Sequence, residues 1–312
     1  MAQSAQPGFL NRLLDRTVVM SFGSSGFRRH SKLFADDFNR DLKGKRVLVT
    51  GGTGGIGLSV AQTLSDLGAQ ITITGRNAEK GEQQRTDSVE FVQLDMADWK
   101  ALKKFCDESS GYDHLVFNAG GMPEKLGHND FGKELQVASQ LYGHYIVMNC
   151  LQDQNKLAEG ARIVWVSSGG MYLKPLDLKN LDSPSEYDKV TVYANVKRAQ
   201  VTLVEELAND PKWDDCAITA MHPGWVATDG VKGSIPRFYK LTRSILRKPE
   251  EGADTINWLV ASKKAPESGK FYFDRSAVSP YISSKSIPSE NKRSILLDKL
   301  HQAYSGLCES TG

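Results

Sequence analysis

The chain has 312 residues, enough for one large α/β domain or two small ones. Its 39 lysine and arginine residues nearly balance 37 aspartate and glutamate residues, and this formal charge of +2 argues against a dedicated nucleic-acid-binding protein. A hydrophobic content of 40% is typical of a globular protein, and no uncharged apolar run approaches the ~18 residues of a membrane span. We therefore expect a globular protein with no nucleic-acid partner that does not cross a membrane.

The four cysteines lie far apart and form neither a C-x-x-C pair nor a cluster with histidine. They are Cys106, Cys150, Cys216 and Cys308. We therefore predict isolated buried thiols and no metal site. The N-terminus lacks the apolar core and small-residue cleavage site of a signal peptide, so we expect a cytoplasmic location.

From Arg46 onward, short β-branched runs alternate with helix-like stretches, which predicts an α/β fold with a mostly parallel, seven-stranded sheet and helices on both faces. The predicted strands are 46–50, 70–74, 91–95, 114–118, 162–167, 217–222 and 269–273. The predicted helices are 56–67, 98–108, 133–156, 190–209 and 250–262, with a short one at 292–304. The connection between the second and third strands looks too short for a full helix. No repeat or linker divides the chain, so we expect one domain.

A glycine-rich segment, TGGTGGIG at residues 50–57, directly follows the first predicted strand and opens an apolar helix. The backbone N–H groups of such a turn, together with the helix N-terminus, suit a pyrophosphate. The segment therefore predicts a dinucleotide site and a Rossmann-type, doubly wound sheet. We expect the contacts to come from Gly51, Thr53, Gly55, Ile56 and Gly57.

The end of the second predicted strand carries Arg76, about 20 residues after the glycine turn, where an acidic side chain would bind the ribose of NAD. A guanidinium at this position can instead pair bidentately with the 2′-phosphate of NADP. The sequence therefore favours NADP(H) over NAD(H). The alternative is a solvated arginine at a strand end.

Tyr193 and Lys197 are four residues apart in a predicted helix, so their side chains share one face. Ser168 ends the preceding strand, at the sheet edge where open α/β sheets bind ligands. A tyrosine is a weak acid or base near neutral pH unless a nearby ammonium stabilises its phenolate. We predict that Lys197 has this effect on Tyr193 and that Ser168 holds the reacting oxygen.

Together these motifs resemble the short-chain dehydrogenase/reductase family over about residues 43–275. The resemblance implies further cofactor contacts at Asp95 after the third strand, at the Asn118-Ala119-Gly120 turn, and at Pro223, Gly224, Val226 and Thr228 of the P-G-x-x-x-T signature. It also implies that Ser168, Tyr193 and Lys197 are catalytic, with Tyr193 and Lys197 additionally binding the cofactor. Within the family, VSSGGMY, MHPGWVATDGV and SGKFYFDR resemble one particular subgroup.

One departure concerns Gln140, which stands where the family has a catalytic asparagine in a proton relay. Glutamine has the same donors and acceptors but is one methylene longer. We treat Gln140 as a catalytic candidate whose support of the relay is open.

The resemblance implies an oxidoreductase that transfers a hydride between nicotinamide and a carbonyl or alcohol substrate. Arg76 makes NADP(H) the expected cofactor, and the basic amphipathic segments described below favour a lipophilic substrate. The alternative is a non-catalytic dinucleotide-binding sensor or scaffold. A further alternative is a nucleotide-sugar enzyme, because the turn also fits T-G-x-x-G-x-x-G, but the short chain after residue 228 favours a simple reductase.

In many family members, helices equivalent to 133–156 and 190–209 form a dimer interface, which implies a homodimer here.

Around this single domain (46–275), which binds the dinucleotide and carries the catalytic residues and a lid (229–249), we expect a basic amphipathic extension (1–45) and a C-terminal tail (276–312). The extension and the lid are both basic. The extension places Leu10, Leu13, Leu14 and Val18 on one helical face. The lid alternates apolar residues with the basic residues Lys232, Arg237, Lys240, Arg243, Arg247 and Lys248. Such segments suit peripheral contact with an anionic membrane surface. The alternative is that the extension packs on the domain and the lid is solvated.

Overall fold

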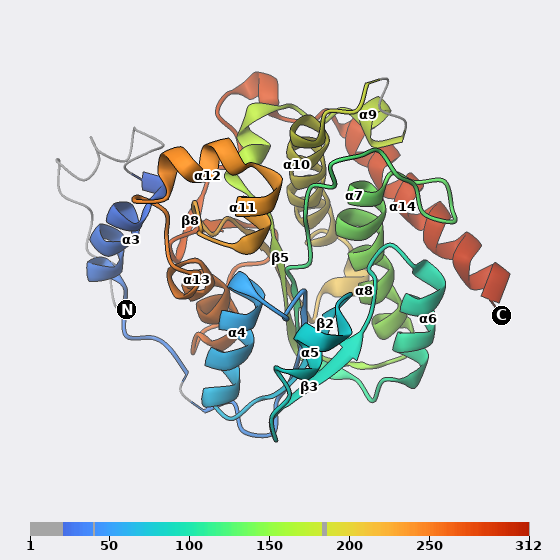
Figure 1. Ribbon diagram of the computed structural model, residues 1–312. Coiled ribbons are helices and arrows are strands. Elements are labelled where there is room, and N and C mark those ends of the chain that lie inside the picture. The colour runs from blue at the N-terminus through green and yellow to red at the C-terminus, as the bar shows by residue number, and fades with distance from the viewer. Residues whose placement is uncertain (1–20, 40, 183–185, 312) are drawn as a thin grey trace.

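Eight strands form one sheet in the computed structural model, which describes residues 21–39, 41–182 and 186–311 (Figure 1). The spatial order is β3-β2-β1-β4-β5-β6-β7-β8, and all neighbours from β3 to β7 are parallel. The strands are β1 Arg46–Thr50, β2 Gln70–Gly75, β3 Val89–Gln93, β4 Tyr112–Phe117, β5 Leu157–Val166, β6 Ala217–Met221, β7 Phe271–Phe273 and β8 Ser276–Val278. This order confirms the predicted single-domain, doubly wound α/β fold.

The eighth strand is an addition to the seven that the sequence predicts. β8 pairs antiparallel with β7 through a two-residue turn, Asp274 and Arg275, whose φ angles are 47° and 59°. Two-residue hairpins require this left-handed region, which glycine, asparagine and aspartate adopt most readily. Because an arginine occupies the second position, the turn lacks the usual hairpin signal in the sequence.

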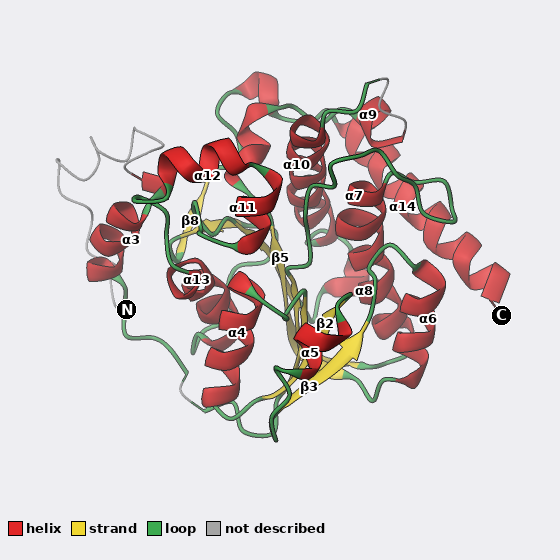
Figure 2. Ribbon diagram, in the orientation of Figure 1, coloured by secondary structure: helices red, strands yellow, loops and turns green. Residues whose placement is uncertain are grey.

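Helices cover both faces of the sheet (Figure 2). One apolar layer joins the sheet to α4 (Gly55–Asp66) and α13 (Pro249–Ala261), and the opposite layer joins it to α6 (Trp99–Glu108), α8 (His144–Asp153) and α10 (Lys189–Leu207). Val47, Leu48 and Val49 of β1 are fully buried, as expected for a strand covered on both sides. The strand order reverses between β1 and β4, and open α/β sheets bind ligands outside the carboxyl ends of strands at such a switch point.

The predicted helix 133–156 is interrupted in the structure. It consists of α7 (Leu135–Val137), a π-helical turn η2 (Ala138–Gly143) and α8. A Cβ atom on Gly143 would lie 2.1 Å from the carbonyl oxygen of Met96, so the helix passes against the chain after β3 at a distance that only glycine permits. The interruption therefore reflects a tertiary contact that the helical periodicity does not show.

The residues after 275 were expected to be a polar tail with a short helix at 292–304. They contribute β8 and a longer helix that contains this range, α14 (Glu290–Thr311). Leu296, Leu300 and Leu307 of α14 are buried in the main apolar cluster. α14 packs against α10, α8 and α6. α14 therefore contacts, within one chain, α8 and α10, which belong to the two helices expected to form a homodimer interface.

The shorter elements lie mainly around the rim of the sheet. They are α3 Ser24–His30, η1 Ser31–Leu33, α5 Ala78–Glu82, η3 Gly169–Leu173, α9 Leu178–Asp182, η4 Pro211–Trp213, α11 Asp229–Ser234, α12 Pro236–Thr242 and η5 Ser284–Ser286. α5 is the short connection expected between β2 and β3, and α11 and α12 belong to the expected lid. The predicted apolar face of Leu10, Leu13, Leu14 and Val18 lies outside the described residues. None of the helices within the described ranges is long and apolar enough to cross a membrane.

Candidate active site

The glycine turn between β1 and α4 is packed so tightly that side chains would not fit at several positions. Gly51 has a φ of 67°, and a Cβ atom there would lie 2.8 Å from the Cα of Ala119. A Cβ on Gly57 would lie 2.4 Å from the carbonyl oxygen of Gly51, whereas one on Gly54 would meet nothing within 4 Å. The turn therefore has an open side, next to the N-terminus of α4, that suits an anionic group.

The Asn118-Ala119-Gly120 turn is bound to the glycine turn by a dense set of hydrogen bonds. The amide of Asn118 donates to the carbonyl oxygens of Thr50 and Gly51, each at 3.1 Å. The backbone N–H groups of Asn118 and Ala119 both donate to the Thr50 hydroxyl at 3.0 Å. These bonds fix the ends of β1 and β4 against each other at the switch point of the sheet.

Arg76 and Asp95 lie at the ends of neighbouring strands, β2 and β3. Arg76 is exposed, and its carbonyl oxygen accepts a hydrogen bond from Gln93 at 3.0 Å. Asp95 is also exposed and accepts a hydrogen bond from the backbone N–H of Ala97 at 2.9 Å. Thr53 contacts Gly75, the residue before Arg76, because a Cβ atom on Gly75 would lie 2.6 Å from the Thr53 methyl group. Arg76 therefore directly follows a residue that contacts the glycine turn.

The Pro223-to-Thr228 loop reaches the other side of the glycine turn. A Cβ on Gly55 would lie 3.1 Å from the Thr228 methyl group, and Val226 is buried against Gly252 at the start of α13. The hydroxyl of Thr228 accepts a hydrogen bond from Val231 and thereby caps α11. Two predicted cofactor segments thus meet at Gly55.

Ser168, Tyr193 and Lys197 come together beyond the end of β5. Burial raises the pKa of the Tyr193 phenol, and a hydrogen bond with Ser168 opposes this rise. The Ser168 hydroxyl also accepts a hydrogen bond from Gly170 at 3.1 Å, which orients it at the start of η3. The Nζ atom of Lys197 lies 5.3 Å from the centre of the Tyr193 ring. The three predicted catalytic side chains are therefore neighbours.

Lys197 is a deeply buried lysine, with only 3% of its surface exposed. Its ammonium group donates to the carbonyl oxygen of Val166 at 2.9 Å. Burial lowers the pKa of Lys197 to about 7. A buried lysine whose pKa is lowered toward neutrality is typical of a functional site.

Gln140 lies in the π-helical turn η2, and its side chain points to the end of β4. Its amide nitrogen donates to the carbonyl oxygen of Gly121 at 2.7 Å, while its side-chain oxygen is buried with no hydrogen-bond partner among the described residues. Its backbone carbonyl accepts from Gln200 at 2.7 Å and from His144 at 3.0 Å. No hydrogen bond joins Gln140 to Lys197 within the described part of the chain.

Two residues near the site were not singled out from the sequence, and a third, Arg247, was expected in another role. His144 bridges Gln140 and Thr50, and Phe22 contacts Gly169. Arg247 was expected among the exposed basic residues of the lid, and that expectation was wrong, because Arg247 is 1% exposed and paired with Asp274. Its partners are remote in sequence, so the charge pattern could not reveal them.

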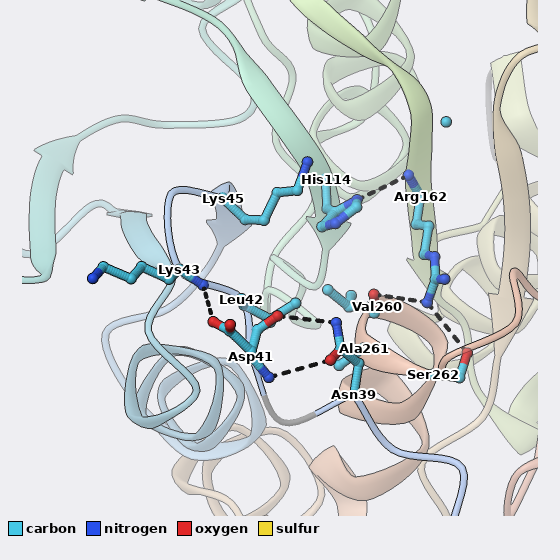
Figure 3. A pocket seen from close by; sticks show the side chains of 11 residues that line it. Asn39, Asp41, Leu42, Lys43, Lys45, His114, Arg162, Val260, Ala261 and Ser262 are labelled. Carbon is cyan, nitrogen blue, oxygen red and sulfur yellow. Dashed lines mark hydrogen bonds between the residues drawn. The ribbon is translucent and has the colours of Figure 1, made fainter.

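Two hollows elsewhere contain none of the predicted site residues. One, of about 250 Å³, lies near the amino ends of β1 and β4 (Figure 3). There Arg162 donates to the carbonyl oxygen of Val260 at 2.9 Å and thus caps the end of α13. The other, of about 570 Å³, lies between α10 and α14. The clustering of the predicted residues, rather than either hollow, identifies the candidate site.

Comparisons with known proteins agree with these motifs. A family model described as short chain dehydrogenase matches residues 45–236. Human dehydrogenase/reductase SDR family member 12 is 32% identical over 306 residues, which cover 92% of this chain and 96% of that protein. Human retinol dehydrogenase 12 is 29% identical over 259 residues, covering 78% and 82%. The first of these relatives belongs to the subgroup that the segments VSSGGMY, MHPGWVATDGV and SGKFYFDR resemble, so the predicted resemblance to that subgroup is confirmed.

Solved structures share the fold. An uncharacterized protein from Mycobacterium paratuberculosis superimposes with a TM-score of 0.70 at 24% identity, covering 86% of this chain and 96% of that one. A short chain dehydrogenase from Burkholderia cenocepacia, solved in complex with NADP, has a TM-score of 0.59 at 24% identity, covering 74% and 96%. At this identity the two structures support the fold alone.

Proposed function

The chain belongs to the short chain dehydrogenase family, and we propose that it transfers a hydride between NADP(H) and a carbonyl or alcohol group of a lipophilic substrate. As a member of this family it is an oxidoreductase that binds a nicotinamide dinucleotide. The form of the cofactor, the substrate class and the roles of individual residues are proposed. The observation that carries the proposal is the grouping of the Ser168 and Tyr193 hydroxyls with the buried Lys197 ammonium.

The residues around the glycine turn fit a dinucleotide. The close approach of Gly51 and Gly57 to neighbouring backbone, with open space at Gly54, suits a pyrophosphate at the N-terminus of α4. We propose that Gly51, Thr53, Gly55, Ile56 and Gly57 hold the pyrophosphate, that Asp95, Asn118, Ala119 and Gly120 border the adenosine half, and that Pro223, Gly224, Val226 and Thr228 hold the nicotinamide end. The exposed guanidinium of Arg76 is the proposed partner of a 2′-phosphate.

Each catalytic side chain has a proposed task. When bound, the nicotinamide ring supplies or accepts the hydride. The Tyr193 hydroxyl donates a proton to the substrate oxygen during reduction, or accepts it during oxidation. Ser168 donates a hydrogen bond to the same oxygen and holds it near Tyr193. Lys197 stabilises the tyrosinate by its charge and binds the nicotinamide ribose.

Gln140 is proposed to serve the proton relay in place of asparagine. Its buried side-chain oxygen has no partner among the described residues and can accept a hydrogen bond from a water or a ribose hydroxyl. Its backbone carbonyl is already engaged by Gln200 and His144, so a relay here would use the side chain.

A lipophilic substrate is supported by the lid and by one relative. Ile235, Phe238 and Tyr239 are only partly buried, and Leu241 is 84% exposed. A relative named for retinol, an apolar alcohol, matches most of the chain. These features favour aldehydes, ketones and alcohols with long apolar groups over small polar ones.

The lid is also the proposed site of peripheral contact with an anionic lipid surface. Five of its basic residues are exposed: Lys232, Arg237, Lys240, Arg243 and Lys248. Each lysine or arginine near such a surface contributes about 1 kcal/mol to binding, and salt screens this attraction.

We expect co-sedimentation with phosphatidylserine vesicles, but not with phosphatidylcholine vesicles, and weaker binding after Arg237, Lys240 and Arg243 are changed to alanine. The matched control changes three exposed lysines outside the lid, Lys263, Lys264 and Lys270, to alanine. Absence of binding at low salt would refute the contact.

The function is tested by a screen for NADPH oxidation against aldehydes, ketones, steroids, retinoids and lipid-derived carbonyls, after binding of NADPH has been measured by its fluorescence. We expect turnover of at least one apolar carbonyl. Cofactor binding without turnover across the panel would instead favour the non-catalytic sensor.

A further inference from the structure

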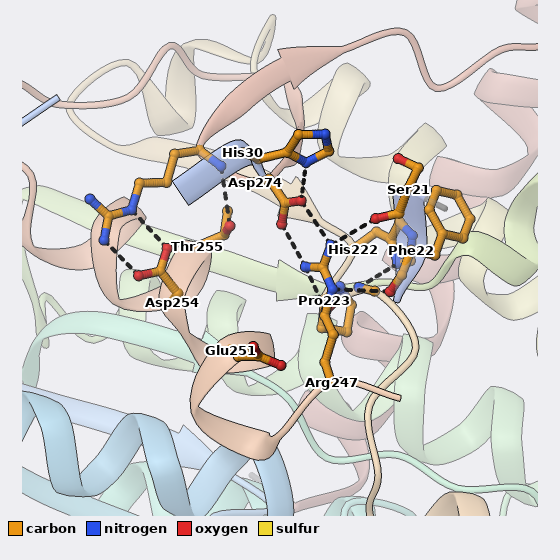
Figure 4. Close-up of polar contacts among 12 residues, drawn as sticks. Ser21, Phe22, His30, His222, Pro223, Arg247, Glu251, Asp254, Thr255 and Asp274 are labelled. Carbon is orange, nitrogen blue, oxygen red and sulfur yellow. Dashed lines mark hydrogen bonds and ion pairs between the residues drawn. The ribbon is translucent and has the colours of Figure 1, made fainter. Parts of the chain in front are cut away.

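The guanidinium group of Arg247 uses all five of its N–H donors (Figure 4). Two bind the carboxylate of Asp274, with Nη1 to Oδ1 at 2.5 Å and Nη2 to Oδ2 at 2.8 Å. The other three bind backbone carbonyls: Nε donates to Phe22 at 3.0 Å, Nη2 to Ser21 at 3.1 Å and Nη1 to Pro223 at 3.3 Å. A buried arginine with every donor satisfied is held in a single orientation.

These acceptors belong to three segments that are far apart in the sequence. Ser21 and Phe22 precede α3, Pro223 begins the loop proposed to hold the nicotinamide end, and Asp274 lies in the β7–β8 turn. The backbone strengthens the junction, because Trp225 donates to the carbonyl of Phe22 at 2.8 Å and Arg247 donates to that of Trp225 at 2.7 Å. Arg247 therefore joins residues 21–24, which we call the N-terminal strap, to the loop.

The strap is also fixed at its other end. The backbone N–H of Ser24 donates to the carbonyl of Ile245, and its hydroxyl donates to Glu251, both at 2.9 Å. Glu251 in turn accepts a hydrogen bond from the backbone N–H of Lys248 at the start of α13. The strap thus bridges the end of the lid and the first turn of α13.

The β7–β8 turn holds the carboxylate of Asp274 in place despite its unfavourable backbone conformation. Asp274 and Arg275 both have positive φ angles, which cost free energy in residues other than glycine. Their side chains compensate: Asp274 also pairs with His30 at 2.6 Å, and Arg275 pairs bidentately with Asp254 at 2.6 and 2.8 Å. The anchor of Arg247 is therefore rigid.

The aromatic ring of Phe22 approaches Gly169, the residue that follows Ser168. It packs edge-on against His222, with 4.3 Å between ring centres. A Cβ on Gly169, the residue after Ser168, would lie 2.8 Å from the Phe22 ring and 3.1 Å from Nε2 of His222. The strap therefore packs against the segment that carries Ser168.

From these contacts we propose that Arg247 is a positioning residue of the active site. Through the N-terminal strap, Arg247 fixes the position of the Pro223-to-Thr228 loop relative to the Ser168–Gly169 segment. The inference rests on the proposed function, because the loop matters only if it holds the nicotinamide end of the cofactor. A displacement of about 1 Å in such a loop can slow a reaction by about 100-fold.

The test compares the full-length wild type with Arg247→Lys, because lysine keeps the charge but cannot reach five separated acceptors. Two ligands are used: NADPH, and 2′-phospho-ADP-ribose, which lacks only the nicotinamide. We expect the variant to bind NADPH about tenfold more weakly, to bind the fragment within about twofold of wild type, and to turn over a validated substrate about 10- to 100-fold more slowly. A purely structural role would weaken both ligands together or neither.

Arg293→Lys is the matched control, because Arg293 of α14 is also ion-paired, with Glu205 and Glu206, but lies outside the site. It should change stability without changing the ratio of the two affinities. Should Arg247→Lys fail to fold, Phe22→Ala leaves the ion pair intact and should slow turnover, whereas Phe105→Ala, which removes a ring of α6 packed on Tyr112, should not.

The outcomes separate the two claims. A wild type that binds neither ligand contradicts the proposed function itself. A wild type that binds both ligands and turns over substrate, alongside Arg247→Lys and Phe22→Ala variants with wild-type NADPH affinity and turnover, overturns the positioning role of Arg247 alone.

Discussion

The hydroxyl of Thr50, at the end of β1, lies 3.0 Å from Nε2 of His144 in α8. The other ring nitrogen of His144 faces the carbonyl of Gln140 at 3.0 Å, and because a carbonyl only accepts, Nδ1 must carry the proton. Burial lowers the pKa of His144 to about 3, so the ring is neutral and Nε2 accepts from Thr50. Thr50 in turn accepts from Asn118 and Ala119. The network joins the glycine turn, the end of β4 and the π-helical turn.

Removing the ring nitrogens of His144 should therefore destabilise the protein. His144→Phe keeps the stacking on Phe117 but leaves a buried hydroxyl and carbonyl with fewer partners, at a cost of about 1–3 kcal/mol in the free energy of unfolding. A double-mutant cycle with Thr50→Val, followed by denaturant unfolding, should give a coupling energy of about 0.5–3 kcal/mol. Strictly additive effects would contradict the network.

Arg76→Ala should weaken the binding of NADPH while leaving that of NADH unchanged. The guanidinium is proposed to pair with a 2′-phosphate, and hydrogen bonds to charged groups are worth about 1.5–3 kcal/mol, or about tenfold or more in affinity. Dissociation constants for both cofactors check this, with Arg85→Ala, which breaks an exposed pair with Glu82, as the control. A wild type that binds both cofactors equally would refute the preference.

The depressed pKa of Lys197 predicts how the stability of the cofactor-free protein depends on pH. Lys197 titrates at about 7 when folded, against an ordinary value of 10.5, so between these values the unfolded chain binds more protons and stability rises with pH. Below about pH 7 Lys197 is charged in both the folded and the unfolded state, so the folded state bears the full free-energy cost of burying this charge. Each unit of pKa shift corresponds to about 1.4 kcal/mol.

Lys197→Met should therefore be more stable than wild type at pH 7, and the difference should shrink as the pH rises toward 10. Denaturant unfolding of both proteins across this range measures it. Parallel curves for the two proteins would show that Lys197 is not the titrating group.

Gln140 provides a test of the proton relay. Gln140→Ala should slow turnover, while Gln140→Asn, which preserves the amide, should maintain or raise it. Unfolding curves serve as the control, because Gln140 also binds Gly121 through its side chain. An alanine variant with wild-type turnover would show that the relay does not pass through this side chain.

The parts of the molecule that could be predicted from the sequence are those whose structure depends on residues close together in the chain. β1 matches its predicted limits because a β-branched run ends at a glycine turn, and the motifs there also indicated the family. The unpredicted parts depend on remote contacts. The helix containing Gln140 is interrupted because Gly143 meets Met96, and Arg247 is buried because its partners lie at residues 21, 22, 223 and 274.

The C-terminal region shows the same limit. Its polar composition suggested a tail, but three leucines of α14, Leu296, Leu300 and Leu307, suffice to bury one face of the helix. Their spacing is helical, yet the sequence alone does not show which helices they cover.

The most direct test of the proposed function is the rate of NADPH oxidation by Tyr193→Phe on a substrate that the wild type reduces. The variant loses one hydroxyl, so turnover should fall by about 10²- to 10⁴-fold while NADPH affinity stays nearly unchanged. A Tyr193→Phe variant with wild-type turnover would contradict the assignment of Tyr193 as the acid and, with it, the catalytic site proposed around Ser168 and Lys197.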